Sequence, residues 1–253
     1  MPSSSTSVNK LGRKIVFEED THKYYIDDSS RGRIHFTSVT TFIGNFFPKF
    51  DADRIAPFVA KKRGITVQEV LDEWDRNRQE SCDFGTRVHA CCEDTINGRE
   101  LRYIPTNEKE ERTYANAVRA ANTIIEQFDI IGAEQLIFDE KLKLSGTIDL
   151  LAKSKTAENT YCIIDWKTNK EIRSFSKYNE FAFKPIQDLP DCEKSHYGLQ
   201  LTLYGHILKS GLYIPDDAKL LYLLVHVTPD GNNYIPIVGY EKYVDLMLGT
   251  IEV

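Results

Sequence analysis

Three charged residues lie in two apolar segments of the stretch 144–170, which reads LSGTIDLLAKSKTAENTYCIIDWKTNK. Asp149 lies in the first segment, and Asp165 and Lys167 lie two residues apart in the second. Because side chains alternate along a strand, Asp165 and Lys167 should project to the same face of a sheet. Burying two carboxylates beside an ammonium costs free energy unless they find partners. A divalent cation between the carboxylates would offset that cost and would activate water for phosphodiester hydrolysis.

A second pair of candidate ligands lies on a helix predicted over residues 84–96, which Asn97 and Gly98 should end. His89 and Glu93 are four residues apart and therefore share one face of that helix. This face could present an imidazole and a carboxylate to a cation. The alternative is an ordinary surface pair, because polar residues at this spacing are common on helices.

Hydrophobic periodicity and turn signals predict the elements that must position these residues. Ser38 should cap a helix that follows a strand beginning at Arg33, and Thr66 with Glu69 forms a capping box. The other predicted strands cover residues 14–18, 23–27, 134–144, 147–152, 161–167, 219–227 and 234–238. The other predicted helices cover residues 51–63, 66–77, 84–96, 108–128, 196–208 and 240–248.

The composition is that of an ordinary globular protein with room for one sizeable α/β domain or two small ones. Of the 253 residues, 41% are hydrophobic and 28% are charged. No apolar run has the length of a membrane span, so we expect no membrane association. The net charge of -6 argues against a protein that coats nucleic acid nonspecifically. It is compatible with an enzyme that binds nucleic acid through a local basic strip.

The polar start, MPSSSTSVNKLGRK, lacks the apolar core of a secretory signal, and we expect a frayed terminus there. An odd number of cysteines without such a signal indicates reduced thiols, so we expect an intracellular protein. The five cysteines are Cys82, Cys91, Cys92, Cys162 and Cys192. Their spacing contains no CxxC zinc pattern, and the bland role for Cys91, Cys92 and Cys162 is as small buried side chains.

Four motifs follow one another along the predicted elements: GTRVHACCE, SGTIDLLA, IIDWKTNK and QLTLY. In this order and on these elements, the chain resembles the RecB-like branch of the PD-(D/E)xK nuclease superfamily, which includes phage and viral exonucleases. The resemblance covers residues 83–228. The expected order of elements holds if the helix at 108–128 is an insertion in the core. It implies a restriction-endonuclease-like α/β core, in which helices flank a central mixed sheet in the order helix, three strands, helix, strand. Residues 1–82 would be a hairpin and helical extension packed on a core of residues 83–253.

The resemblance also implies roles for individual residues. The implied metal ligands are His89, Glu93, Asp149, Asp165 and the main-chain carbonyl of Trp166. The implied catalytic residues are Lys167, Asp149, Asp165, Glu93, Gln200 and Tyr204. Gln200 and Tyr204 match a motif that steadies the lysine and contacts the substrate strand, and Arg87 and Thr168 are further candidates for substrate binding. Ile148 stands where many members of the superfamily have proline.

The expected cofactor is Mg²⁺ or Mn²⁺, as one or two ions, because hard oxygen ligands with one histidine suit both. Some relatives hold an iron–sulfur cluster through three late cysteines, but no cysteine follows Cys192, so we expect no cluster. The expected partner is DNA, as single strands or duplex ends. The preference for exonuclease action follows the family analogy and the aromatic residues between 175 and 183, which could stack on bases or simply pack. The alternatives are a catalytically silent nucleic-acid-binding module, a scaffold protein and an RNA-directed nuclease.

Overall fold

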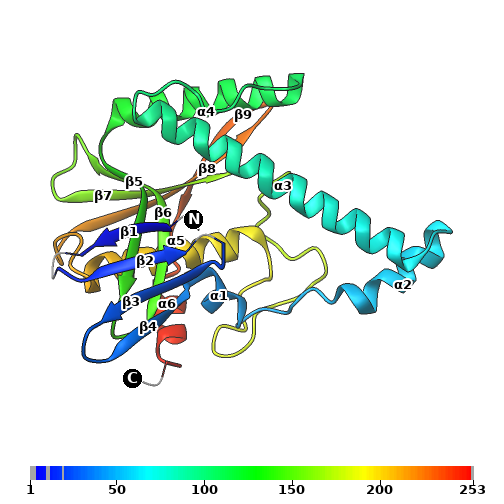
Figure 1. The fold of residues 1–253 in the computed structure, drawn as a ribbon, viewed down its shortest axis with the longest axis horizontal. Helices are drawn as coiled ribbons and strands as arrows, with labels where there is room; N and C mark the ends of the chain where they lie inside the picture. The colour runs from blue at the N-terminus through cyan, green and yellow to red at the C-terminus, as the bar shows by residue number, and fades with distance from the viewer. Residues whose placement is uncertain (1–3, 10–11, 19, 252–253) are drawn as a thin grey trace.

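The computed structural model describes residues 4–9, 12–18 and 20–251 of the chain. In these residues nine strands form one sheet in the order β1-β2-β3-β4-β6-β7-β8-β9, and β5 pairs with β6 (Figure 1). The strands are β1 Ser4–Val8, β2 Lys14–Glu18, β3 Lys23–Asp28, β4 Gly32–Ser38, β5 Phe128–Asp139, β6 Leu144–Ser154, β7 Thr160–Lys167, β8 Lys219–Thr228 and β9 Gly231–Ile237. The sheet is mixed, since β4 with β6 and β7 with β8 are parallel and the other pairs are antiparallel. The expected α/β class with a central mixed sheet is confirmed.

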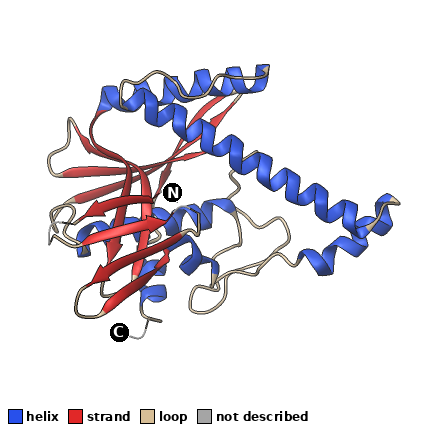
Figure 2. Cartoon of the chain, in the orientation of Figure 1, coloured by secondary structure: helices blue, strands red, loops and turns tan. Residues whose placement is uncertain are grey.

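Helices cover both faces of this sheet (Figure 2). The helices are α1 Val39–Gly44, α2 Ala52–Arg63, α3 Val67–Ile96, α4 Glu108–Gln127, α5 Glu193–Ser210 and α6 Glu241–Leu248, of which α2 packs on the first turns of α3 and away from the sheet. One apolar cluster joins α3 and α4 to the sheet, and a second joins α1, α5 and α6 to the opposite face. Among the described residues, no helix combines the length and the apolar composition needed to cross a bilayer.

The two helices expected over 66–77 and 84–96 are one continuous helix, α3, of 30 residues. The expected break is wrong because residues 77–84 contain neither glycine nor proline, so nothing forces the backbone out of the helix. The intervening turn also gains a hydrogen bond, since Gln79 donates to Asp83 at 2.8 Å. The capping box is confirmed, because Thr66 accepts from the Glu69 N–H and Glu69 accepts from the Thr66 N–H.

The helix over 108–128, which the resemblance treats as an insertion, packs into the core. Its structural counterpart, α4, buries Tyr114, Ala117 and Ile124 against α3 and the sheet. The strand expected over 134–144 also needs correction, because residues 140–143 form a turn between β5 and β6. Lys143 takes the left-handed conformation in this turn, with φ of 53°. Pairing of the two strands on either side of the turn therefore begins at Asp139.

The polar start of the chain contributes a strand, and the expectation of a frayed terminus is wrong for residues 4–8. Its main chain pairs with β2 in an antiparallel ladder, which needs no apolar side chains. Residues 1–3 lie outside the described part of the chain.

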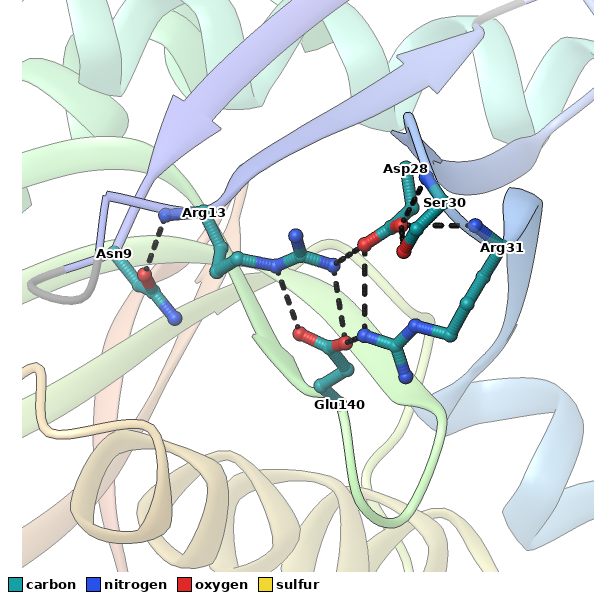
Figure 3. A network of polar contacts seen from close by, with 6 residues as sticks. All are labelled: Asn9, Arg13, Asp28, Ser30, Arg31 and Glu140. Atoms are coloured by element: carbon teal, nitrogen blue, oxygen red, sulfur yellow. Dashed lines mark hydrogen bonds and ion pairs between the residues drawn. The ribbon is translucent and has the colours of Figure 1, made fainter.

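An ion-pair network fastens this N-terminal hairpin to the turn after β5 (Figure 3). Arg13 donates to Asp28 at 2.8 Å and to Glu140 at 3.0 Å, and Arg31 donates to the same Glu140 at 2.8 Å. Next to it, β4 pairs with β6 in parallel through Thr37 and Leu144. The N-terminal strands thus continue the sheet that carries the candidate site.

Candidate active site

Three carboxylates occupy neighbouring positions on adjacent strands. The register of β5 against β6 sets Glu134 opposite Asp149. Pairing of β6 with β7 ends at Leu150 and Ile164, and Asp149 and Asp165 occupy the next position. The ladder therefore stops where the carboxylates of the two strands would meet. Carboxylates gathered in this way repel one another unless a cation lies between them.

His89 of α3 completes a candidate metal centre with two of these acids. One ligand atom from each of His89, Glu134 and Asp149 lies within 4.8 Å of the other two. His89 Nδ1 lies 3.3 Å from Asp149 Oδ2, which also accepts a hydrogen bond from the Trp166 N–H at 2.9 Å. Two carboxylates and an imidazole suit a divalent cation such as Mg²⁺ or Mn²⁺, so the donor set fits the expected cofactor.

Glu134 is the ligand candidate that sequence reasoning missed. It has a φ of 48°, a left-handed conformation that is uncommon outside glycine. Burial and, after it, the negative charges of Asp149, Glu93 and Asp165 together raise the pKa of Glu134 to about 8. Its side chain nevertheless keeps an open side toward solvent. The signal in the sequence was an acid placed to pair opposite Asp149, which requires the register of β5 to be known.

Glu93, the acid predicted as a ligand on the helix, lies in a different set of contacts. Its carboxylate forms a close ion pair with Arg102 and lies 3.7 Å from Arg99. Glu93 is one helical turn from His89, so it still contributes negative charge near the cluster. Among the described residues, the three-membered ligand cluster contains Glu134 and not Glu93.

This arrangement predicts different effects for the two glutamates. Glu134→Gln is expected to raise the Mg²⁺ or Mn²⁺ concentration needed for half-maximal cleavage by at least about 10-fold, because it removes a ligand charge. Glu93→Gln is expected to produce a smaller shift, since Arg102 already neutralises Glu93. Titrations of cleavage rate against metal concentration would compare the variants, and an equal shift for both would contradict the placement.

Asp165 and Lys167 form a buried ion pair on the face of β7 that contacts α5. Lys167 Nζ lies 2.5 Å from Asp165 Oδ2, and Asp165 is only 2% exposed. Burial raises the pKa of Asp165 to about 6, against the stabilising charge of Lys167. Burial alone would lower the pKa of Lys167, but Asp165 and Asp149 outweigh it and raise that pKa above its ordinary value. Lys167 is therefore an ammonium that can donate hydrogen bonds.

Helix α5 presents Gln200 and Tyr204 to this pair. The Gln200 side-chain amide donates to Asp165 at 3.4 Å and to the Tyr204 hydroxyl at 3.1 Å. Tyr204 is 4% exposed and lies over Gly146, where an added Cβ would come within 2.5 Å of the ring. The absence of a side chain at Gly146 thus allows Tyr204 to reach Gln200.

Gly146→Ala is expected to lower the free energy of unfolding by about 1–3 kcal/mol, because the new methyl group overlaps Tyr204. It is also expected to slow cleavage, since the displaced ring no longer supports Gln200. Urea denaturation measures the first effect. The second substitution Tyr204→Leu should restore part of the stability of Gly146→Ala but none of the activity, and equal stability of wild type and Gly146→Ala would contradict the contact.

Arg87 and Thr168, the two further residues predicted to bind substrate, have different surroundings. Arg87 donates to Glu110 at 2.8 Å and to the Tyr114 hydroxyl at 3.0 Å, so its contacts join α3 to α4. Thr168 follows the end of β7, and its hydroxyl would lie 3.4 Å from a Cβ on Gly85. Glycine at this position lets the backbone of α3 pass close to the end of β7.

Three cysteines were expected to be small buried side chains, and the structure confirms this. Cys91, Cys92 and Cys162 pack in the apolar cluster between α3, α4 and the sheet. Burial raises the pKa of the Cys91 thiol to about 11 and that of Cys162 to about 12. Such thiols stay protonated and are poor metal ligands.

The mixed sheet covered by helices is that of a restriction-endonuclease-like fold. A comparison with family models matches residues 58–250 to the PD-(D/E)XK nuclease superfamily. Because the match covers well over half of the chain, the chain belongs to this superfamily, whose members are generally nucleases that use divalent metals. No curated protein matches the chain significantly.

Proposed function

We propose that this chain is a metal-dependent DNA exonuclease of the RecB-like branch, acting inside a cell in DNA repair, recombination or replication. The observation that carries the proposal is the convergence of His89, Asp149 and Asp165 beside Lys167, at the position where β6 and β7 stop pairing. The four ordered motifs and the exposed aromatic side chains beside the site support the choice of branch and substrate.

The residues of the site would have different roles in the reaction. His89, Glu134, Asp149 and Asp165 would hold Mg²⁺ or Mn²⁺. A bound ion of this kind lowers the pKa of water and neutralises charge on the phosphate. Lys167 is an ammonium held against Asp165, and it would donate hydrogen bonds to the attacking water or to the phosphoryl oxygens as negative charge develops. Gln200 would keep the Asp165 carboxylate in its orientation.

A single gel tests the proposal. End-labelled linear single-stranded DNA, linear duplex, circular DNA and single-stranded RNA are incubated with the full chain and Mg²⁺, Mn²⁺ or EDTA. We expect linear DNA to be degraded with either metal, and circular DNA and RNA to remain intact. Cutting of circles would replace exonuclease action by endonuclease action, and cleavage in EDTA would remove the metal from the mechanism.

His89→Ala separates metal binding from DNA binding. We expect it to shift the metal titration of cleavage to higher concentrations, because the imidazole is one of the candidate ligands. The affinity for DNA measured in EDTA should change little. An unchanged titration curve would return His89 to an ordinary surface pair.

A further inference from the structure

A cleft of about 750 Å³ lies beside the catalytic lysine. One wall consists of residues 48–55, which end the connection from α1 and begin α2, and the other consists of residues of the loop 173–192 and the start of α5. Figure 1 shows the course of both loops. Tyr197 of α5 lines this cleft, and its ring centroid lies 4.6 Å from Lys167 Nζ. One side chain therefore contacts both the cleft and the candidate active site.

The two walls are anchored to the protein core. In the loop, Ala182, Ile186 and Leu189 are buried in the same apolar cluster as α1 and α5. The Phe183 N–H donates to the Phe46 carbonyl at 2.6 Å, which joins the loop of one wall to the connection from α1 that leads into the other. Because both walls are held by buried side chains and by this hydrogen bond, the packing of the fold determines the shape of the cleft.

Two aromatic rings of the cleft lining are exposed to solvent. Phe50 is 68% exposed, and Tyr178 on the opposite wall is 73% exposed. Trp74 of α3 packs edge-on behind Phe50, with ring centroids 5.3 Å apart, so the Phe50 ring is supported from one side and open on the other. Exposed rings of this kind offer faces on which unpaired bases can stack.

The charges of the lining are nearly balanced. Arg173 forms a close pair with Glu193, and Arg54 lies 3.5 Å from Asp51. The lining also contains the acids Glu180 and Asp191 and the cations Lys49 and Lys177. Within the part of the chain that the structure describes, neither lysine has an ion pair, and Lys177 Nζ lies 5.5 Å from the centroid of the Tyr178 ring.

We propose that this cleft binds the single-stranded part of the DNA substrate beside the active site. Unpaired bases stack on Phe50 and Tyr178, and phosphates lie near Lys49 and Lys177. A duplex is disfavoured, because its bases present no free faces and its dense phosphate charge would meet the carboxylates of the lining. The inference rests on the proposed nuclease function and adds where the substrate strand lies and in which form.

The first test is fluorescence anisotropy of labelled single-stranded and blunt duplex DNA, measured with the full chain in EDTA so that no cleavage occurs. The double variant Phe50→Ala/Tyr178→Ala is expected to weaken single-strand affinity by about 10-fold or more, and duplex affinity much less. The control is Phe58→Ala, because Phe58 is 74% exposed on α2 and does not line the cleft. It is expected to bind both forms like the wild type.

The second test is the salt dependence of single-strand binding. Lys49→Ala/Lys177→Ala is expected to reduce the slope of log affinity against log salt by about 1.4, which corresponds to two phosphate contacts on a single strand. Lys61→Ala/Lys62→Ala removes two cations from the end of α2, outside the cleft, and should leave the slope unchanged.

Unchanged single-strand affinity in Phe50→Ala/Tyr178→Ala would overturn the cleft assignment, and so would tighter wild-type binding of duplex or of single-stranded RNA. Hydrolysis of the p-nitrophenyl ester of thymidine 5′-monophosphate by the wild type tests the metal site alone, because this substrate has no flanking strand. Failure of that hydrolysis would count against the proposed function, whereas altered strand binding concerns the cleft.

Discussion

Asp149→Asn is expected to lower the rate of metal-dependent DNA cleavage by at least about 1,000-fold, which is about 4 kcal/mol of lost transition-state stabilisation. The fold should survive, because asparagine keeps an oxygen that can accept the hydrogen bond from the Trp166 N–H. In EDTA the melting temperature should be unchanged or higher. Asp149 lies near the carboxylates of Glu134 and Asp165, so replacing it with asparagine removes electrostatic repulsion among the three acids when no cation is bound.

Melting curves with and without Mn²⁺ complete this experiment. A ligand that binds only the folded state raises the melting temperature, so the wild type should be stabilised by the metal. Asp149→Asn should lose most of this rise, whereas Asp75→Asn, at an exposed carboxylate of α3, should keep it. Cleavage within about 10-fold of wild type, together with a normal metal-induced rise, would contradict the placement of Asp149 in the metal centre.

Lys167→Met is expected to reduce cleavage by a similar factor but to have the opposite effect on stability. Asp165 would then be a buried carboxylate without its cationic partner, and breaking a buried ion pair from one side costs about 3–5 kcal/mol. Urea denaturation in EDTA measures this loss. The stability of Asp149→Asn and Lys167→Met in the absence of metal thus separates the two proposed roles, metal ligand and ion-paired ammonium.

The matched control is the double variant Asp165→Asn/Lys167→Met. Because it removes both charges, it should recover much of the stability lost in Lys167→Met while remaining inactive. Equal stability of wild type and Lys167→Met would show that the ion pair contributes nothing to folding. A fully active Lys167→Met protein would exclude Lys167 from the reaction.

Several features could be predicted from the sequence because they depend on contacts between residues close in the chain. Alternation along β7 placed Asp165 and Lys167 on one face, and the structure has them in an ion pair. Helical spacing brought Gln200 and Tyr204 into contact through one hydrogen bond. The start of α3 followed from the reciprocal hydrogen bonds between Thr66 and Glu69.

Other features depend on segments that are distant in the chain. Glu134 joins His89 and Asp149 only because β5 pairs with β6 in one particular register and α3 packs against the sheet. Glu93 shares a helix face with His89, but Arg102 forms a close ion pair with its carboxylate. Periodicity alone could not distinguish these two acids, since it gives neither the register of β5 nor the contact with Arg102.

The amino-acid order determined the α/β class and the identities of the acids, the histidine and the lysine, because strand and helix periods and capping are local properties. Strand register and helix packing determined which acid meets the histidine, whether α4 belongs to the core and where the cleft opens. The reason is that ladder pairing and side-chain burial bring together residues far apart in sequence, and the free energy of those contacts belongs to the assembled sheet.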